Sequence, residues 1–478
     1  MVSAVAIGAL LVAFPFPAMK PEAARLLAVL AGAIVLWVTE ALPVGVTALA
    51  APALCVVLGV APADKAFASF GNPLLYLFFG AFVLAAAAER TRLDRWLAGR
   101  LLPGAGATPL RKVLTLTYVT AGLSSMLSNT ATTAMVLPVL RATVARLSDG
   151  ARALGLLTAA YASSLGGVLT PVGTPPNLLA IAALRQYAKF DVPFFAWTLV
   201  ALPMAAALLG LWTFLLVRGL RGATPGDDAT ESAPTPHATE PAGAELDVGQ
   251  RSTLIALTVA VLGWVLPGLL ELALGSGDDT VKLVKKALPE GVVGIAAAAL
   301  LFVLPATTRS VAGVERPRPV LEWGEASQID WGTILLFGGG LALGDLAFQT
   351  GLSAWIGQGV LEVTGVRSEI GLTVLFSTVA VLLSELTSNT ATAALLCPLA
   401  VMTSQQVGIS PVAPCMAAGM AASMGFLMPI STAPNAIVYG TGQVPLRTMA
   451  KTGALLDLAG IVVIPPVVLI VTRWVGLR

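Results

Sequence analysis

The sequence predicts an all-α, polytopic membrane protein built from two inverted repeats. Of its 478 residues, 56% are hydrophobic and only 11% are charged, whereas soluble domains carry about 25% charged residues. Apolar runs of about 20 residues recur along the chain, and this length crosses a hydrocarbon core of roughly 30 Å. One short polar motif occurs in each half, inside such apolar sequence.

Eleven apolar segments are predicted to be transmembrane helices, and two of them are broken. They are 3–18, 24–40, 44–60, 73–89, 153–184 (broken), 194–217, 252–273, 290–305, 331–349, 411–440 (broken) and 453–472. Two further apolar segments, 112–140 and 370–402, are interrupted in the middle by Ser-Asn-Thr. Broken backbone inside a bilayer has to be buried in protein or line a wet cavity. We therefore expect both to be re-entrant helical hairpins. The short amphipathic segments 91–102 and 351–363 are predicted interfacial helices.

The repeated motif is Ser-Asn-Thr-Ala-Thr, at 128–132 and at 388–392. A second pair of phrases follows at a similar distance, Val-Gly-Thr-Pro-Pro-Asn at 172–177 and Ile-Ser-Thr-Ala-Pro-Asn at 430–435. A polar kink that satisfies its own backbone would explain one copy. It does not explain two copies at matched spacing, each followed by a Pro-Asn loop.

The chain is predicted to consist of two repeats, 1–217 and 252–478, joined by a disordered cytoplasmic linker at 218–251. The linker is rich in Pro, Thr, Ala and acidic residues, and such a segment cannot bury enough apolar surface to order itself. Five predicted spans separate the two hairpins, so the second repeat is inverted, an architecture typical of transporters. With a cytoplasmic N-terminus, most Lys and Arg residues face the cytoplasm, as the positive-inside rule requires.

Composition argues against several other classes of function. The formal net charge of +2 gives no indication of a nucleic-acid partner. The three cysteines, Cys55, Cys397 and Cys415, have neither metal-ligand nor disulfide spacing. The only histidine, His237, lies in the linker, so a membrane hydrolase would lack its intramembrane base. The sequence therefore does not predict an enzyme.

The chemistry of the paired motifs favours an anion that is bound together with cations. Helix N-termini carry partial positive charge and free N–H groups that suit carboxylates, whereas unwound carbonyls suit Na⁺. An Asn side chain offers both an acceptor and two donors. No Lys or Arg lies within either motif or its partner loop. Because unpaired buried charge is costly, bound cations have to help compensate an anionic ligand.

On these motifs, and on Thr-Glu-Ala-Leu-Pro at 39–43, the chain resembles the divalent anion/sodium symporter family over nearly its whole length. These are the sodium-coupled di- and tricarboxylate transporters. The resemblance implies a homodimer in the plasma membrane, with a scaffold domain and a transport domain that moves by an elevator mechanism. It also implies two or more Na⁺ ions around one substrate. Ala433 departs from the family's usual Thr-Pro-Pro-Asn, which leaves substrate choice open.

The resemblance also assigns residues to sites. The first Na⁺ site would consist of Ser124, Ser128, Asn129 and the backbone of Gly173, and the second of Ser384, Thr387, Asn389 and the backbone of Ser431. Substrate carboxylates would meet Ser128, Asn129, Thr130, Thr174, Ser388, Asn389, Thr390 and Thr432.

The expected substrate is a C4-dicarboxylate such as succinate, malate or fumarate, with 2-oxoglutarate, citrate and sulfate left open. The alternatives are a Na⁺-independent dicarboxylate exchanger, a proton-coupled carrier that uses Glu385 or Asp345, and, more distantly, a channel. Asp345, Glu385 and Asp457 are intramembrane acids and hence functional candidates. For Asp345 we expect a structural hydrogen bond. Glu385 either adds negative field for a cation or is solvated in an outer vestibule.

Overall fold

The computed structural model describes residues 19–39, 41–101, 108–221, 245–275, 278–311 and 314–477. The predicted span 3–18, Glu40 and most of the predicted linker lie outside the described residues. The described first half contains α2 (Pro21–Thr39), α3 (Val44–Val57), α4 (Ala63–Phe67), η1 (Ala68–Gly71), α5 (Pro73–Arg90), α6 (Leu93–Leu101), α7 (Pro109–Ser124), α8 (Asn129–Val144), α9 (Asp149–Gly167), α10 (Pro175–Tyr187) and α11 (Phe194–Leu220).

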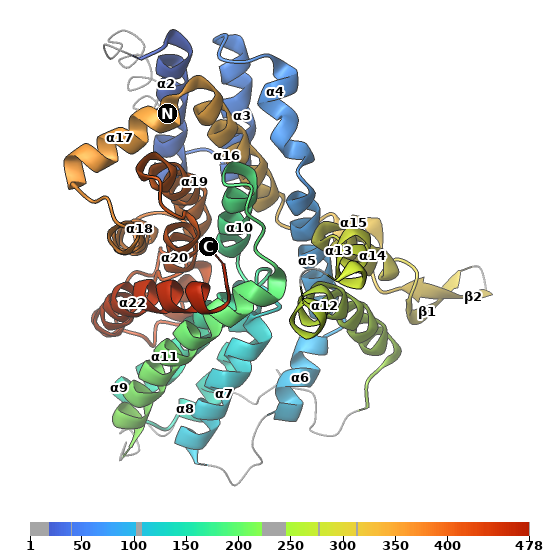
Figure 1. Ribbon diagram of the computed structural model, residues 1–478. Coiled ribbons are helices and arrows are strands. Elements are labelled where there is room, and N and C mark those ends of the chain that lie inside the picture. Colours follow the sequence, from blue (N-terminus) through green and yellow to red (C-terminus); the bar gives the residue numbers. More distant parts are fainter. Residues whose placement is uncertain are drawn as a thin grey trace.

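The described second half is also mainly helical (Figure 1). It contains α12 (Val248–Leu274), α13 (Asp279–Ala287), α14 (Glu290–Leu300), β1 (Pro305–Val311), β2 (Val314–Pro319), α15 (Trp323–Ala326), α16 (Trp331–Thr350), α17 (Leu352–Thr364), α18 (Glu369–Ser384), α19 (Asn389–Val407), α20 (Val412–Ala421), α21 (Ala433–Tyr439) and α22 (Leu446–Trp474).

Among the described residues, five helices are long and apolar enough to cross a membrane. They are Pro73–Arg90, Phe194–Leu220, Val248–Glu271, Trp331–Thr350 and Leu446–Trp474. A sixth span results if α17 and α18, bent by 96° at their junction, are counted together. Other predicted spans are represented by shorter apolar helices, including α3, α14 and α20. A polytopic helical membrane protein is confirmed, whereas the count of eleven spans stays a prediction.

The fold is not wholly helical, because β1 and β2 form an antiparallel hairpin that was not predicted. It projects from the side of the helices in Figure 1. Its position shortens the predicted span 290–305, since α14 already ends at Leu300 and β1 begins at Pro305. The Ser252 hydroxyl at the start of α12 donates to the Pro305 carbonyl at 2.7 Å, which ties the base of the hairpin to the helices.

The ends of the predicted linker are also helical. Helix α11 continues to Leu220, and α12 begins at Val248 behind a capping box in which Asp247 and Gln250 bond each other's backbone N–H groups. Such a box satisfies two donors that the first turn of a helix otherwise leaves unpaired. Residues 222–244 lie outside the described part of the chain.

Helices of each half pack against helices of the other, and the pairs formed by the first half resemble those formed by the second. Helix α3 packs against α16, and its counterpart α14 packs against α5. In the same way, α10 packs against α19 and α20, while α21 packs against α8 and α9. The long helices α11 and α22, which end the two halves, also contact each other. Each repeat therefore completes its core with elements of the other.

Both Ser-Asn-Thr motifs interrupt a pair of helices. Helix α7 ends at Ser124 and α8 begins at Asn129, while α18 ends at Ser384 and α19 begins at Asn389. The two Pro-Asn phrases break the chain between α9 and α10 and between α20 and α21. The predicted hairpins 112–140 and 370–402 are thus helix–break–helix units, and their re-entrant course through the bilayer stays a prediction.

Candidate functional site

Four helices begin at one place, and a hydroxyl-bearing residue caps each of them. Ser128, Thr174, Ser388 and Thr432 are the N-caps of α8, α10, α19 and α21. The Ser388 hydroxyl accepts a hydrogen bond from the Ala391 N–H at 3.2 Å, and Ser128 and Thr432 cap their helices in the same way. The N-terminal partial charges of these helices are therefore directed at a common space.

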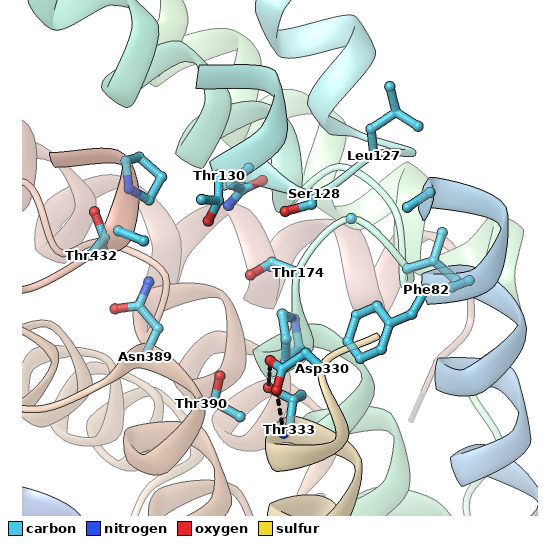
Figure 2. Close-up of a pocket in the computed structure, with 18 of the residues that line it drawn as sticks. Phe82, Leu127, Ser128, Thr130, Thr174, Asp330, Thr333, Asn389, Thr390 and Thr432 are labelled. Carbon is cyan, nitrogen blue, oxygen red and sulfur yellow. Dashed lines mark hydrogen bonds between the residues drawn. The ribbon is translucent and has the colours of Figure 1, made fainter. Parts of the chain in front are cut away.

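That space is a cavity of about 390 Å³, large enough for a small organic ligand. All eight predicted substrate-binding residues line it: Ser128, Asn129, Thr130, Thr174, Ser388, Asn389, Thr390 and Thr432. Figure 2 shows several of these side chains around the cavity, with Phe82 and Asp330 across from them. The fold thus brings together motifs that lie far apart in the sequence.

The charged side chains that line the cavity are acidic. Glu89 and Asp330 are on its wall, and its described lining residues include no Lys or Arg. A dianion in this cavity would meet only N–H groups, hydroxyls and amides as donors. Bringing it out of water without a positive counter-charge would be costly, so the site's chemistry calls for cations beside the anion.

Oxygen atoms gather around Asn129, where the first Na⁺ site is predicted. Its Oδ1 accepts a hydrogen bond from the Ser124 hydroxyl at 2.6 Å. The amide lies directly over Gly167, where a Cβ would come within 2.4 Å of that Oδ1. At Gly173 a Cβ would meet the carbonyl oxygens of Gly167 and Ser125 at 2.5 and 2.8 Å. The two glycines therefore keep a close set of neutral oxygens open, and such oxygens suit Na⁺.

The corresponding place in the second repeat contains a buried acceptor that lacks a donor. The Asn389 Oδ1 atom is buried and has no hydrogen-bond partner within the described part of the chain. At the neighbouring Gly425, a Cβ would lie 3.2 Å from this oxygen and from the Cβ of Ser431. A buried oxygen without a donor is unfavourable unless something binds it, and a cation would do so.

Three of the predicted Na⁺ ligands do not line the cavity. Ser124 and Ser384 are fully buried, and Thr387 is nearly so. The Ser384 hydroxyl donates to the Met424 carbonyl at 3.2 Å, and the Thr387 hydroxyl bonds that of Thr392 at 2.8 Å. Gly173 and Ser431, by contrast, do line the cavity. The predicted cation ligands therefore lie partly on the cavity wall and partly buried behind it.

The asparagines of the two Pro-Asn phrases close the loops rather than face the cavity. The Asn177 amide donates to the carbonyls of Gly167 and Thr170 at 3.0 and 2.7 Å. The Asn435 amide donates to those of Gly425 and Met428, both at 2.9 Å. Both asparagines are fully buried. They hold the loops that present Thr174 and Thr432, a role that the sequence left unexplained.

We expect Asn435→Ala to destabilise the protein by about 2–6 kcal/mol, because the Gly425 and Met428 carbonyls lose their donor at about 1–3 kcal/mol each. The expected result is a lower melting temperature of the purified protein and a lower affinity for substrate. Thermal unfolding in detergent measures the first effect. Thr258→Ala, which removes an exposed hydroxyl bonded to the Leu254 carbonyl of its own helix, is the control and should melt close to the wild type. An Asn435→Ala protein as stable as this control would contradict the loop-closing role.

The intramembrane acids have different surroundings. Asp345 accepts hydrogen bonds from the Ser69 hydroxyl, at 2.6 Å, and from the Gln186 amide, so the predicted structural hydrogen bond is confirmed. Glu385 is only 9% exposed and bonds backbone N–H groups. The interpretation of Glu385 as a solvated vestibule residue is therefore wrong, because the loop between α20 and α21 covers its carboxylate.

Sequence reasoning missed the wall opposite the motifs. Phe82 and Glu89 come from α5, while Gln328 and Asp330 come from the segment before α16. The Asp330 carboxylate caps α16 by accepting from the Thr333 N–H at 3.0 Å. An Asp three residues before a Thr at the start of an apolar run predicts a helix start. The same sequence pattern does not indicate that this helix start faces a cavity formed by other segments.

Comparison with known proteins agrees with the fold. "Sodium-dependent dicarboxylate transporter SdcS" of Staphylococcus aureus (strain USA300) is 29% identical over 445 residues, covering 90% of this chain and 82% of the relative. The Alcanivorax borkumensis YdaH transporter aligns with a TM-score of 0.53 at 17% identity, over 86% of each chain. Neisseria gonorrhoeae MtrF aligns with a TM-score of 0.55 at 15% identity, over 88% of this chain and 84% of its own.

The family comparison covers almost the entire sequence. The model described as "Sodium:sulfate symporter transmembrane region" matches residues 1–477. This match agrees with the resemblance found in the repeated motifs, and it places the protein among membrane transporters rather than enzymes. The chain belongs to the sodium:sulfate symporter family, the family of divalent anion/Na⁺ symporters.

Proposed function

We propose that the protein is a secondary active transporter that couples the uptake of a divalent anion, a C4-dicarboxylate, to Na⁺. The observation that carries the proposal is the cavity itself. Four helix N-termini and all eight predicted substrate-binding side chains, each with a hydroxyl or amide group, converge there, without a basic residue among the described lining residues. The similarity to a sodium-dependent dicarboxylate transporter supports the same substrate and the same ion.

The proposed mechanism divides the charge between the protein and the ions. Each carboxylate of the substrate faces one repeat, where it accepts hydrogen bonds from the Asn amide, the hydroxyls and the first-turn N–H groups of α8 or α19. Two or more Na⁺ ions bind beside Asn129 and Asn389 and neutralise the dianion. Because neither partner binds well without the other, substrate and ions cross together, which is the physical basis of symport.

Movement is proposed to follow an elevator mechanism. The cavity lies between α5 with the start of α16, on one side, and the helices of the four motifs on the other. A body that carries the motifs past such a wall would expose the cavity to alternate sides. The homodimer, the plasma-membrane location and the cytoplasmic N-terminus belong to the same proposal, and they follow from the family resemblance and the distribution of Lys and Arg.

Radiolabelled succinate uptake into proteoliposomes tests the function. We expect uptake under an inward Na⁺ gradient and background uptake under an equal K⁺ gradient. Unlabelled malate, fumarate, 2-oxoglutarate, citrate and sulfate, added as competitors, rank the substrates. Uptake that is equal in K⁺ and requires internal succinate would instead show an exchanger. Uptake driven by an acid gradient without Na⁺ would show a proton-coupled carrier.

A further inference from the structure

Glu385 has an unusual place for an intramembrane acid. It follows α18 directly, at the break before Asn389, and its side chain reaches the loop between α20 and α21. Its Oε1 accepts from the Leu427 N–H at 2.8 Å and its Oε2 from the Met428 N–H at 3.1 Å. The Ser431 hydroxyl also donates to Oε2. Three donors therefore hold both oxygens of the Glu385 carboxylate in place.

The corresponding position of the first repeat is uncharged. The offset that relates Ser128 to Ser388 relates Ser125 to Glu385. At Ser125 the loop is held by its backbone instead, because the Thr170 hydroxyl donates to the Ser125 carbonyl. Both repeats therefore tie the Pro-Asn loop to the break between their helices. Only the second does so with a carboxylate.

Glu385 also lies close to the predicted second Na⁺ site. It contacts Ser431, a residue that lines the cavity and is a predicted ligand of the second Na⁺ site. Asp457 of α22 is 6% exposed and lies beside Glu385, so a second acidic side chain adjoins the first behind this site. The Asn389 Oδ1 atom, which has no donor among the described residues, belongs to the same predicted site.

We propose that Glu385 is a positioning residue that makes the two cation sites unequal. It fixes the Ser431 segment and adds a negative charge behind the second site, so that this site binds Na⁺ more tightly and fills first. The inference rests on the proposed function. A partner that orients a metal ligand and makes it more basic typically changes metal affinity about 10–100-fold. The low dielectric of a buried site also strengthens the attraction between the carboxylate and a bound cation.

The test is the Na⁺ dependence of succinate uptake by Glu385→Gln. This change keeps the size of the side chain and removes its charge. We expect the half-saturating Na⁺ concentration to rise about tenfold, while the maximal rate in saturating Na⁺ is largely retained. Glu385→Asp, which keeps the charge, should lie between Gln and wild type. Glu369→Gln, an acid at the other end of α18 that pairs with Arg473, is the matched control and should leave the Na⁺ dependence unchanged.

A second variant keeps the proposal open to refutation if Glu385→Gln does not fold. Ser431→Ala retains the carboxylate and its two backbone hydrogen bonds but removes the hydroxyl contact, and it should also raise the half-saturating Na⁺ concentration. An unchanged Na⁺ dependence in the folded Gln variant, or in Ser431→Ala where Gln fails to fold, would overturn the proposal. So would a loss of rate in both Gln and Asp variants that high Na⁺ does not restore. Failure of the proposed function can be told apart from this outcome, because succinate uptake by the wild-type protein would then not depend on Na⁺.

Discussion

Asn129→Ala and Asn389→Ala are each expected to reduce Na⁺-driven succinate uptake about 100-fold, the upper end of effects seen when a metal site loses a supporting group. Each side chain lines the cavity and offers an oxygen to a cation and an amide to a carboxylate. Alanine removes both at once. In the proposed mechanism ions and substrate stabilise each other, so the loss of either contact weakens the binding of both.

Initial uptake rates at saturating Na⁺, normalised to the amount of reconstituted protein, measure this effect. Thr258→Ala is the control, since its exposed hydroxyl only bonds the Leu254 carbonyl of its own helix and should have no effect. Size-exclusion profiles and melting temperatures of the variants separate loss of function from misfolding. A well-folded variant at either Asn that transports at the wild-type rate would contradict the assignment of that motif.

Gly173→Ala is expected to abolish uptake, whereas Gly425→Ala should retain it. At Gly173 the new methyl would meet two backbone oxygens at 2.5 and 2.8 Å, those of Gly167 and Ser125. These oxygens lie beside the predicted first cation site, and a shift away from the methyl would disturb Gly173, whose backbone is a predicted ligand. Overpacking of this kind costs typically about 1–3 kcal/mol. At Gly425 the nearest atoms are 3.2 Å away, so a shift of a few tenths of an ångström suffices.

Uptake and Na⁺ dependence of the two variants give the comparison. The Gly425→Ala protein should transport with a moderately raised half-saturating Na⁺ concentration, because its nearest neighbours are Asn389 Oδ1 and Ser431. Gly122→Ala, where nothing lies within 4 Å of the added methyl, is the control for glycine replacement near the first break. Equal uptake by the Gly173 and Gly425 variants would contradict the close packing described for the first site.

The motifs could be predicted because they contrast with their surroundings. A Ser-Asn-Thr in the middle of an apolar run marks a helix break, and its repetition indicates two equivalent breaks. The structure places the breaks next to Ser128 and Ser388, the residues expected from the sequence. Which substrate oxygen meets which side chain, and the two Na⁺ ligand sets, stay predictions.

Other features depend on contacts that no local pattern encodes. Asp330 faces the cavity only because α16 packs beside α3 and near α5, segments far away in the sequence. The buried place of Glu385 results from a loop more than 40 residues further along the chain. The β hairpin was not predicted because the apolar run 290–305 extends to its first residue, Pro305, although the helix itself ends at Leu300. Tertiary packing decides each of these cases.

Equilibrium binding of succinate to the purified protein tests the central claim most directly. The claim is that a cavity with no basic residue among its described lining residues holds a dianion only together with cations. Titrations in NaCl and in choline chloride at equal ionic strength compare the two conditions. The account predicts saturable succinate binding in Na⁺, with affinity that rises with Na⁺ concentration, and no detectable binding in choline. Equal affinity in both salts would contradict it.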